Sequence, residues 1–198
     1  ERPRKRVLRE GVTRKPVAIL LGATFLLFLG FNFFFAGFPV HAATVYGWDT
    51  AELGVFFAIL AGMMFLAQGP LLSFASKRLD RRIVFAVGLG FLVLALISYQ
   101  LPPGPISYVG AACFALGNGL SWPTFQSRIA EVGGDDQGSV QGAITSASSL
   151  ASILGLLGGA FLYPALGGAL FLLAAGMFAV VLVLTPLWFR SITADAPG

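Results

Sequence analysis

The sequence predicts an all-α membrane protein with six transmembrane helices, and three observations support this fold class. The chain is 57% hydrophobic and only 11% charged, whereas a soluble domain usually carries about 25% charged residues. Its mean hydropathy is +0.83. Six apolar stretches are each long enough to cross roughly 30 Å of hydrocarbon as a helix, and all 13 Lys and Arg residues can be placed on one side of the membrane.

The six predicted spans are joined by short connections whose positive charge alternates along the chain. The spans run over residues 17–40, 51–74, 83–101, 105–127, 138–162 and 168–189. The segment 1–16 is strongly basic, and the connection 75–82 holds Lys77, Arg78, Arg81 and Arg82. Arg128 and Arg190 follow the fourth and sixth spans, while the other connections contain no Lys or Arg. Because basic residues near span ends stay in the cytoplasm, both termini are expected there.

This charge pattern also bounds the domain organisation and the partners. We expect a basic cytoplasmic linker at 1–16, a six-helix bundle at 17–189 and a cytoplasmic tail at 190–198. The net charge of +4 does not indicate nucleic acid, because the basic residues flank spans and suit contact with anionic lipid. The apolar run that begins at Val17 is too long for the about 7–15 residues of a signal-peptide core, so it is a true span.

Polar side chains at membrane depth distinguish the spans from one another. The third and sixth spans are almost wholly apolar and are expected to face lipid. The other four carry groups that cost several kcal/mol if buried in hydrocarbon without a partner, so they should face protein or a water-filled cavity. The candidate cavity residues are Asn32, Gln68, Asn118, Ser121, Trp122, Gln126, Ser148 and Ser152.

The spacing of these candidates indicates which of them share a helix face, but it does not decide their role. Asn118, Trp122 and Gln126 are spaced i, i+4, i+8, so they share one face of a helix. That face either lines a polar cavity or bonds to a neighbouring helix. For Asn32 and Gln68 taken alone, structural hydrogen bonding is at least as good an interpretation. In the fifth span small residues recur every four positions, at Ala151, Gly155 and Gly159, which favours close packing or sliding against a partner helix.

Groups that would carry chemistry are sparse. No carboxylate lies in the middle of a span, so no proton-coupling residue can be named from the usual signature. Asp49 and Glu52 precede the second span, where they are either solvated or cap its helix. His41 is expected to be a solvated residue of an outer loop. No metal-binding cluster, phosphate loop or nucleophile motif is present, so we expect no enzyme, cofactor or metal.

Residues 117–163 resemble a known family. The segments GNGLSWP (117–123), QSR (126–128), DDQGSVQG (135–142) and SLASILG (149–155) look like helices ten and eleven of major facilitator superfamily transporters, especially the tetracycline-efflux and related drug:proton antiporters. Tyr46-Gly47-Trp48 followed by Glu52-Leu53-Gly54 resembles the lead-in to helix eight. The segment 73–82 resembles a degenerate copy of the superfamily's helix 2–3 loop motif. The resemblance covers about 17–189.

The resemblance implies that this chain is the C-terminal six-helix half of a twelve-helix transporter built from inverted three-helix repeats. The implied partners are the lipid bilayer, an N-terminal six-helix half, a small-molecule substrate and protons, and the implied location is a bacterial inner membrane. The start of the chain in a charged segment without Met favours a fragment. Departures from the family are Leu156 where Pro is frequent, Lys77 at the loop-motif Asp and Asp80 at its second Gly.

One cytoplasmic segment is expected to take part in the conformational change. It contains Asp135, Asp136, Gln137, Gly138, Gln141 and Gly142. The two carboxylates precede a helix N-terminus, and the glycines leave room for a neighbouring backbone. We expect this loop to pack against a cytoplasmic helix end; a simple helix cap is the alternative.

The leading functional hypothesis is proton-coupled efflux of a small, largely apolar or amphipathic compound by alternating access. An uptake carrier of the same fold, for a sugar or an organic acid, is the alternative within the family. A free-standing six-span scaffold or channel subunit is the alternative outside it. The coding sequence upstream would discriminate among them, because six further spans would establish the class.

The charge pattern predicts which positions are reachable from each side of the membrane. Single cysteines at positions 47 and 103 should react with an impermeant thiol reagent added outside intact cells, and one at position 78 should not. Cys113 is first replaced by serine. Strong outside labelling at 78 with none at 47 would reverse the topology.

Overall fold

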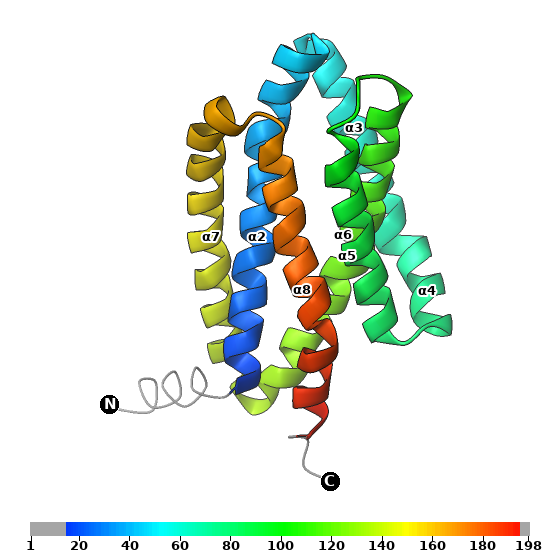
Figure 1. Cartoon of the computed structure of the whole chain (residues 1–198). Helices are drawn as coiled ribbons and strands as arrows, with labels where there is room; N and C mark the ends of the chain where they lie inside the picture. Colours follow the sequence, from blue (N-terminus) through cyan, green and yellow to red (C-terminus); the bar gives the residue numbers. More distant parts are fainter. Residues whose placement is uncertain (1–14, 195–198) are drawn as a thin grey trace.

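The structure, a computed structural model, describes residues 15–194 and builds them almost entirely from helices (Figure 1). The elements are α2 (Lys15–His41), η1 (Ala42–Tyr46), α3 (Thr50–Leu66), η2 (Ala67–Leu71), α4 (Leu72–Arg78), α5 (Arg81–Ser98), α6 (Pro105–Gly133), η3 (Gly134–Asp136), α7 (Gln137–Leu166) and α8 (Ala169–Ala194). η1 and η2 are π-helical turns and η3 is a 3₁₀ turn. Most of the predicted linker and the end of the predicted tail lie outside the described residues.

The six predicted spans all coincide with helical segments, although α6 differs in character from the others. Five segments of the described chain are long and apolar enough to cross a membrane: Val17–Tyr46, Thr50–Arg78, Arg81–Ser98, Gln137–Leu166 and Ala169–Pro186. α6 occupies the fourth predicted span and is 29 residues long. It falls short on composition because Asn118, Ser121 and Gln126 interrupt its apolar sequence.

Two predicted loops are shorter in the structure than in the prediction. The first helical run continues through η1 to Tyr46 and ends where Gly47 adopts a left-handed conformation with φ of 69°. The predicted connection 128–137 is largely helical, because α6 continues to Gly133 and a three-residue turn leads straight into α7. In both places the helix is followed by a glycine with positive φ, since Gly134 has φ of 45°.

The start of α3 settles the role of Asp49 and Glu52. The Asp49 side chain accepts a 2.8 Å bond from the backbone N–H of Glu52, and the Glu52 side chain accepts a 2.9 Å bond from the backbone N–H of Asp49. This reciprocal pair is a capping box, which satisfies two donors that the helix leaves free. The helix-cap interpretation of these carboxylates is confirmed.

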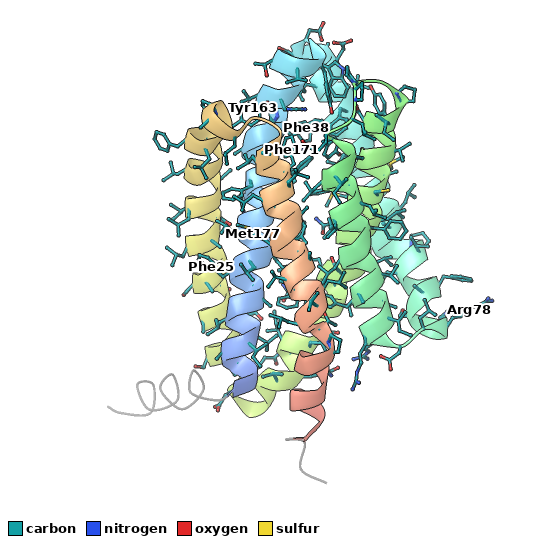
Figure 2. All side chains as sticks on the ribbon, in the orientation of Figure 1. Phe25, Phe38, Arg78, Tyr163, Phe171 and Met177 are labelled. Atoms are coloured by element: carbon teal, nitrogen blue, oxygen red, sulfur yellow. The ribbon has the colours of Figure 1, made fainter. Side chains whose placement is uncertain are left out.

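The helices run alternately up and down, so the described chain begins and ends at the same end of the bundle (Figure 1). The connections after α4 and after α6 lie at that end as well. Arg78 and Arg81 flank the first of these connections and Arg128 lies in the last turns of α6; Arg78 is labelled at this end in Figure 2. We call this the basic end and the opposite one the outer end.

Packing is interleaved between the first three and the last three helical spans. α5, the third span, packs along α6, the fourth; α8, the sixth, packs along α2, the first. In the same way α3 packs on α6, and α7 packs on α2. In each set of three, the second and third spans thus pack on the first span of the other set. This reciprocal arrangement agrees with the predicted fold class, half of a twelve-helix transporter with inverted repeats.

The burial of the helices bears on the expectation that the third and sixth spans face lipid, which stays a prediction. α5 and α8 each bury one face, for instance at Leu92 and Phe178, and expose another, for instance at Leu94 and Val183. α3 and α7 are instead the least buried of the predicted spans. Their exposed side chains are largely apolar, with Phe65 and Phe161 78% and 79% exposed. The hydrophobicity of a span did not indicate how many of its sides other helices cover.

Glycines set the distance between α5 and α6. A Cβ on Gly88 would lie 2.8 Å from the backbone nitrogen of Ser121, and one on Gly117 would lie 2.7 Å from the carbonyl oxygen of Gly88. The two backbones are therefore in direct contact. In lipid, where no hydrophobic force drives helices together, such approach is what lets van der Waals packing hold them.

Close approach at glycines also joins α7 to α2. A Cβ on Gly155 would lie 2.6 Å from the Cβ of Asn32, and one on Gly159 would lie 2.7 Å from the Cβ of Ala36. Ala151 is fully buried in line with them. Of the two interpretations of this small-residue face, close packing is what the structure contains.

An aromatic core fills the outer half of the bundle. Phe34 of α2 stacks on Phe114 of α6 with ring centroids 4.3 Å apart, and Phe38 stacks on Phe56 of α3 at 4.4 Å. Tyr99, which follows α5, lies 4.8 Å from Phe38. Rings from four of the spans thus converge on α2, which makes α2 the central helix of this end.

The contact between α5 and α6 predicts the effect of enlarging Gly88. Gly88→Val should destabilise the bundle by about 1–3 kcal/mol, because the added atoms meet backbone that cannot rotate away. Gly90→Val is the matched control, since a Cβ on Gly90 meets nothing within 4 Å. Denaturation of both variants in detergent gives the comparison; equal stability would show that the contact tolerates separation.

Candidate functional site

The polar face of α6 is the first candidate site. Asn118, Trp122 and Gln126 are all half-buried on α6. Within the described chain the side chains of Asn118 and Gln126 have no hydrogen-bond partner among those recorded, whereas Asn32 has two. Among the described residues the two amides thus make no interhelical hydrogen bond. Their part in a cavity stays a prediction.

Trp122 shows where this face lies. Its ring meets Phe28 of α2 edge to face, with centroids 5.2 Å apart. It also lies 6.0 Å from Phe125, which is buried against Phe85 of α5. The polar face of α6 is thus on the side of α6 turned toward α2, and the Trp122 ring is held in place by apolar neighbours.

Ser121 is placed elsewhere, which corrects its inclusion among the cavity candidates. Its side chain is buried and donates a 2.7 Å bond to the carbonyl of Gly117. The residue lies in the contact with Gly88 of α5. A hydroxyl that donates to a carbonyl of its own helix has a hydrogen-bond partner on any face of that helix. The polarity of Ser121 therefore gave no information about a cavity.

Asn32 and Ser152 are brought together by the packing of α2 on α7. The Asn32 amide donates a 3.1 Å bond to the Ser152 hydroxyl and a 2.7 Å bond to the carbonyl of Phe28. Both residues sit beside the Gly155 approach. The structure thus contains the interhelical bond that was one of the two interpretations of Asn32.

Gln68 and Ser148 do not join either group. Gln68 is exposed in the π-helical turn η2, whose backbone is crossed closely by Gly119 of α6. Ser148 is half-buried and donates to the carbonyl of Thr145 on its own helix. The eight candidates therefore do not form one cluster in this chain.

The predicted conformational loop is mostly the first turns of α7. Gln137, Gly138, Gln141 and Gly142 are helical and exposed, and a Cβ at either glycine meets nothing within 4 Å. No helix end of the described chain packs against these glycines. Asp136 stands at the N-cap without a side-chain capping bond, so the simple-cap alternative is wrong for this residue. The side chain of Asp135 lies outside the described part.

The basic connection is shorter than predicted and is organised by two acids. Lys77 and Arg78 end α4, and Arg81 and Arg82 begin α5, where positive charge opposes the helix dipole. The Asp80 side chain offsets this by accepting a 2.8 Å bond from the backbone N–H of Arg82.

Glu131 ties the basic connection to α6. It pairs with Arg81 of α5 and with Arg128 on its own helix. Sequence reasoning did not single out Glu131, because its partner Arg81 lies fifty positions away. The ion pair of Arg81 with Glu131 links the start of α5 to the end of α6, which are far apart in the sequence.

A second polar cluster, not anticipated as such, lies at the outer end. His41 was expected in solution, and this expectation is wrong: its side chain is only 5% exposed. Its Nδ1 and the hydroxyl of Tyr163 on α7 share a 2.9 Å hydrogen bond. Figure 2 shows Tyr163 close to Phe38 and Phe171 at this end.

Further members of this cluster come from α5 and α6. The Tyr46 hydroxyl donates a 3.3 Å bond to the carbonyl of Tyr99. The hydroxyls of Tyr99 and Ser107, together with Nε2 of His41, are buried and make no hydrogen bond within the described chain. We call His41, Tyr46, Tyr99, Ser107 and Tyr163 the outer polar cluster. Its sequence signal was the density of Tyr and Trp at span ends, which is typical of membrane interfaces and so was not distinctive.

Comparisons with known proteins agree with the resemblance. The family model for the Major Facilitator Superfamily matches residues 20–198. The chain is 31% identical over 149 residues to the class E tetracycline resistance protein of Escherichia coli, an overlap that covers 70% of this chain and 36% of that protein. It is 32% identical over 162 residues to the class G tetracycline resistance protein of Vibrio anguillarum, covering 75% of this chain and 39% of that protein.

A more distant relative is the mouse hippocampus abundant transcript 1 protein, 25% identical over 138 residues, which cover 69% of this chain and 26% of that protein. The chain therefore spans well under half the length of each of these three relatives. All three alignments leave most of the relative unmatched.

Replacement by alanine is predicted to affect stability differently at Asn32 and at Asn118. Asn32→Ala should lower the free energy of unfolding by about 0.5–1.5 kcal/mol, because it removes an interhelical bond and an amide from a tight contact. Asn118→Ala should leave stability unchanged, because no bond in the described chain is lost. Unfolding in mixed detergent measures both; equal losses would contradict the assignment.

Proposed function

Because this chain belongs to the Major Facilitator Superfamily, we propose that it carries a small molecule across a membrane by alternating access, as the C-terminal six-helix half of a proton-coupled efflux transporter. It is an integral membrane protein, and its family membership confirms the expectation that it is not an enzyme. The observation that carries the proposal is the polar face of α6. There, the amides of Asn118 and Gln126 make no hydrogen bond within the described part of the chain.

The free-energy cost of burying amides explains why the polar face of α6 suggests a substrate path. Each unpaired amide in hydrocarbon costs several kcal/mol. Asn118 and Gln126 avoid this cost if their face of α6 borders water or a polar ligand. Asn32, on the neighbouring helix, avoids it differently, by bonding to Ser152. The contrast separates amides used for assembly from amides available to a substrate.

The composition of the polar face indicates the class of substrate. Trp122 offers an aromatic surface that Phe28 holds edge-on, and the flanking Asn118 and Gln126 can donate and accept hydrogen bonds. No charged side chain is part of this face. Such a surface suits a largely apolar or amphipathic compound with a few polar groups. The tetracycline resistance relatives are consistent with this class.

The exposed faces of α3 and α7 support the proposal of a second bundle. These helices bury the least surface of the predicted spans within this chain. Phe65 of α3 and Phe161 of α7 are exposed, as is the polar Gln68 in the turn η2 that continues α3. Transporters of this fold form their site between two bundles that rock against each other. An N-terminal six-helix half would cover these faces and complete the path.

The basic end supports a role in the conformational change. Gly138 and Gly142 present open backbone on the first turns of α7, where the partner half could approach. We place this end in the cytoplasm, with both termini, on the basis of the charge asymmetry. The bacterial relatives favour a bacterial inner membrane. The ion pairs of Glu131 would hold the ends of α5 and α6 together while the bundle moves.

Transport can be tested in liposomes with tetracycline as a fluorescent probe. The natural full-length protein should accumulate tetracycline when a pH gradient is imposed, and the purified 198-residue chain should not. Replacing Asn118 and Gln126 together by leucine should reduce the flux at least about tenfold, because two hydrogen-bonding groups leave the path. Ser146→Ala is the matched control, since this exposed hydroxyl bonds only its own helix.

The remaining hypotheses give distinct results in the same assay. Saturable, gradient-driven flux from the 198-residue chain alone would show that it is complete without a partner. Flux of a sugar or an organic acid, with none of tetracycline, would favour an uptake carrier. Channel-like leak, or no flux with any of these probes, would favour a scaffold or channel subunit.

A further inference from the structure

We infer that His41 is a proton-binding site of this bundle, and that its protonation loosens the outer contact between α2 and α7. The coupling of this proton to transport rests on the proposed function, but the binding of the proton does not. Imidazole is the side chain whose ordinary pKa, about 6.5, lies within the physiological range. It is also the one histidine in the sequence.

The surroundings of His41 suit a ring that alternates between two states of protonation. The ring lies edge-on to Tyr46 at 4.9 Å, to Phe171 at 5.1 Å and to Tyr163 at 6.1 Å between centroids. These contacts come from η1, α8 and α7, so the ring is fixed from three sides. Its Nδ1 has one partner, the Tyr163 hydroxyl, and its buried Nε2 has none within the described chain.

The groups that face the ring are polar but uncharged. The titratable neighbours are the phenols of Tyr46 on η1 and Tyr163 on α7, while Tyr99, which follows α5, interacts with the ring through its backbone. α6 contributes the Ser107 hydroxyl to the cluster, and α8 contributes only Phe171. Among the side chains that the structure describes, no Asp or Glu forms an ion pair with His41; Asp49 and Glu52 are occupied in the cap of α3. A proton on His41 is therefore not neutralised by a fixed acid.

Protonation changes the hydrogen bonds that this cluster can make. Neutral imidazole offers one donor and one acceptor, so its Nδ1 can accept from the Tyr163 hydroxyl, but imidazolium offers two donors and no acceptor. The carbonyl of Tyr99, which already accepts from Tyr46, is a backbone acceptor that interacts with the ring. A bond from imidazolium to this carbonyl would release Tyr46, and an unneutralised charge in this aromatic setting would draw water inward.

The position of the cluster connects it to the rest of the bundle. The contact of α2 with α7 runs from the bond between Asn32 and Ser152, past the close approach at Gly159, to the bond between His41 and Tyr163. His41 is thus the outermost tie of that contact. Loosening it would free the outer end of α7, while the glycine packing nearer the middle holds.

Two measurements on the natural full-length protein in nanodiscs test the inference without any substrate. The imidazole signals of ¹⁵N-histidine-labelled protein, assigned by their loss in His41→Gln and in His41→Asn, should titrate between about pH 5 and pH 8. Spin labels at Val45→Cys and Phe161→Cys, both exposed positions of η1 and α7, should move apart on acidification. His41→Gln should abolish that change in distance.

The controls separate titration from general disturbance. Thr24→Val removes another buried hydrogen-bonding group from α2 and should leave both responses intact. Tyr163→Phe should keep His41 titrating but shift its midpoint, because the ring loses its partner. An imidazole signal that stays in one form from about pH 5 to pH 8 would overturn the inference, as would a pH-dependent distance that persists in His41→Gln.

A transport arm distinguishes this inference from the proposed function. In His41→Gln, pH-driven tetracycline flux should fall at least about tenfold while exchange of internal for external tetracycline stays within about twofold, because exchange needs no net proton movement. Wild-type protein that titrates at His41 but carries no tetracycline would refute the proposed function and leave the proton site standing. Unaltered pH-driven flux in His41→Gln would show that the proton at His41 is not the coupled one.

Discussion

The structure depends on how closely helix backbones can approach one another in a medium that provides no hydrophobic force between them. Four of the contacts contain glycine at a close approach: Gly88 and Gly117 between α5 and α6, Gly155 and Gly159 between α7 and α2, Gly30 between α2 and α8, and Gly119 between α6 and η2. At these points van der Waals attraction acts over whole backbones. The aromatic side chains then fill the space that the crossings leave.

The distribution of polar groups follows from those crossings. Where α2 and α7 touch, Asn32 and Ser152 are close enough to bond, and their polarity serves the assembly. Where α6 faces α2 with less contact, Asn118 and Gln126 keep their hydrogen-bonding capacity. The two ends of the bundle also differ in kind. The basic end is held by exposed ion pairs around Glu131, whereas the outer end is held by buried rings and neutral hydrogen bonds.

This asymmetry bears on the alternating access proposed above. The ion pair of Arg81 with Glu131 is exposed, and exposed ion pairs are weak and screened by salt, so this pair can be exchanged at little cost. The outer polar cluster is sheltered, and a single proton there changes which groups can donate and accept. α2 links the two regions, because Phe28 touches Trp122 while His41, at the end of the same helix, touches Tyr163. A change at one end of α2 therefore has a continuous route to the polar face of α6.

The sequence by itself determined the number of helical spans, their alternation and the side on which positive charge gathers, because these depend on local composition and on the membrane's thickness. Spacing also placed Asn118, Trp122 and Gln126 on one face, and a helix cap was one of the two interpretations that the sequence left open for Asp49 and Glu52. Family resemblance supplied the fold class. All of these features are encoded within a span or at its ends.

Only the tertiary structure decided which polar groups meet. Asn32 and Ser152 are 120 positions apart, and His41 and Tyr163 are 122 apart, so no local pattern could pair them. Ser121 was misplaced because a hydroxyl that bonds its own helix is equally satisfied on either side of it. His41 was misplaced because the helix continued through a π-helical turn to Gly47 and brought the ring under Phe171. The burial of a side chain is a property of its neighbours, and those neighbours come from other helices.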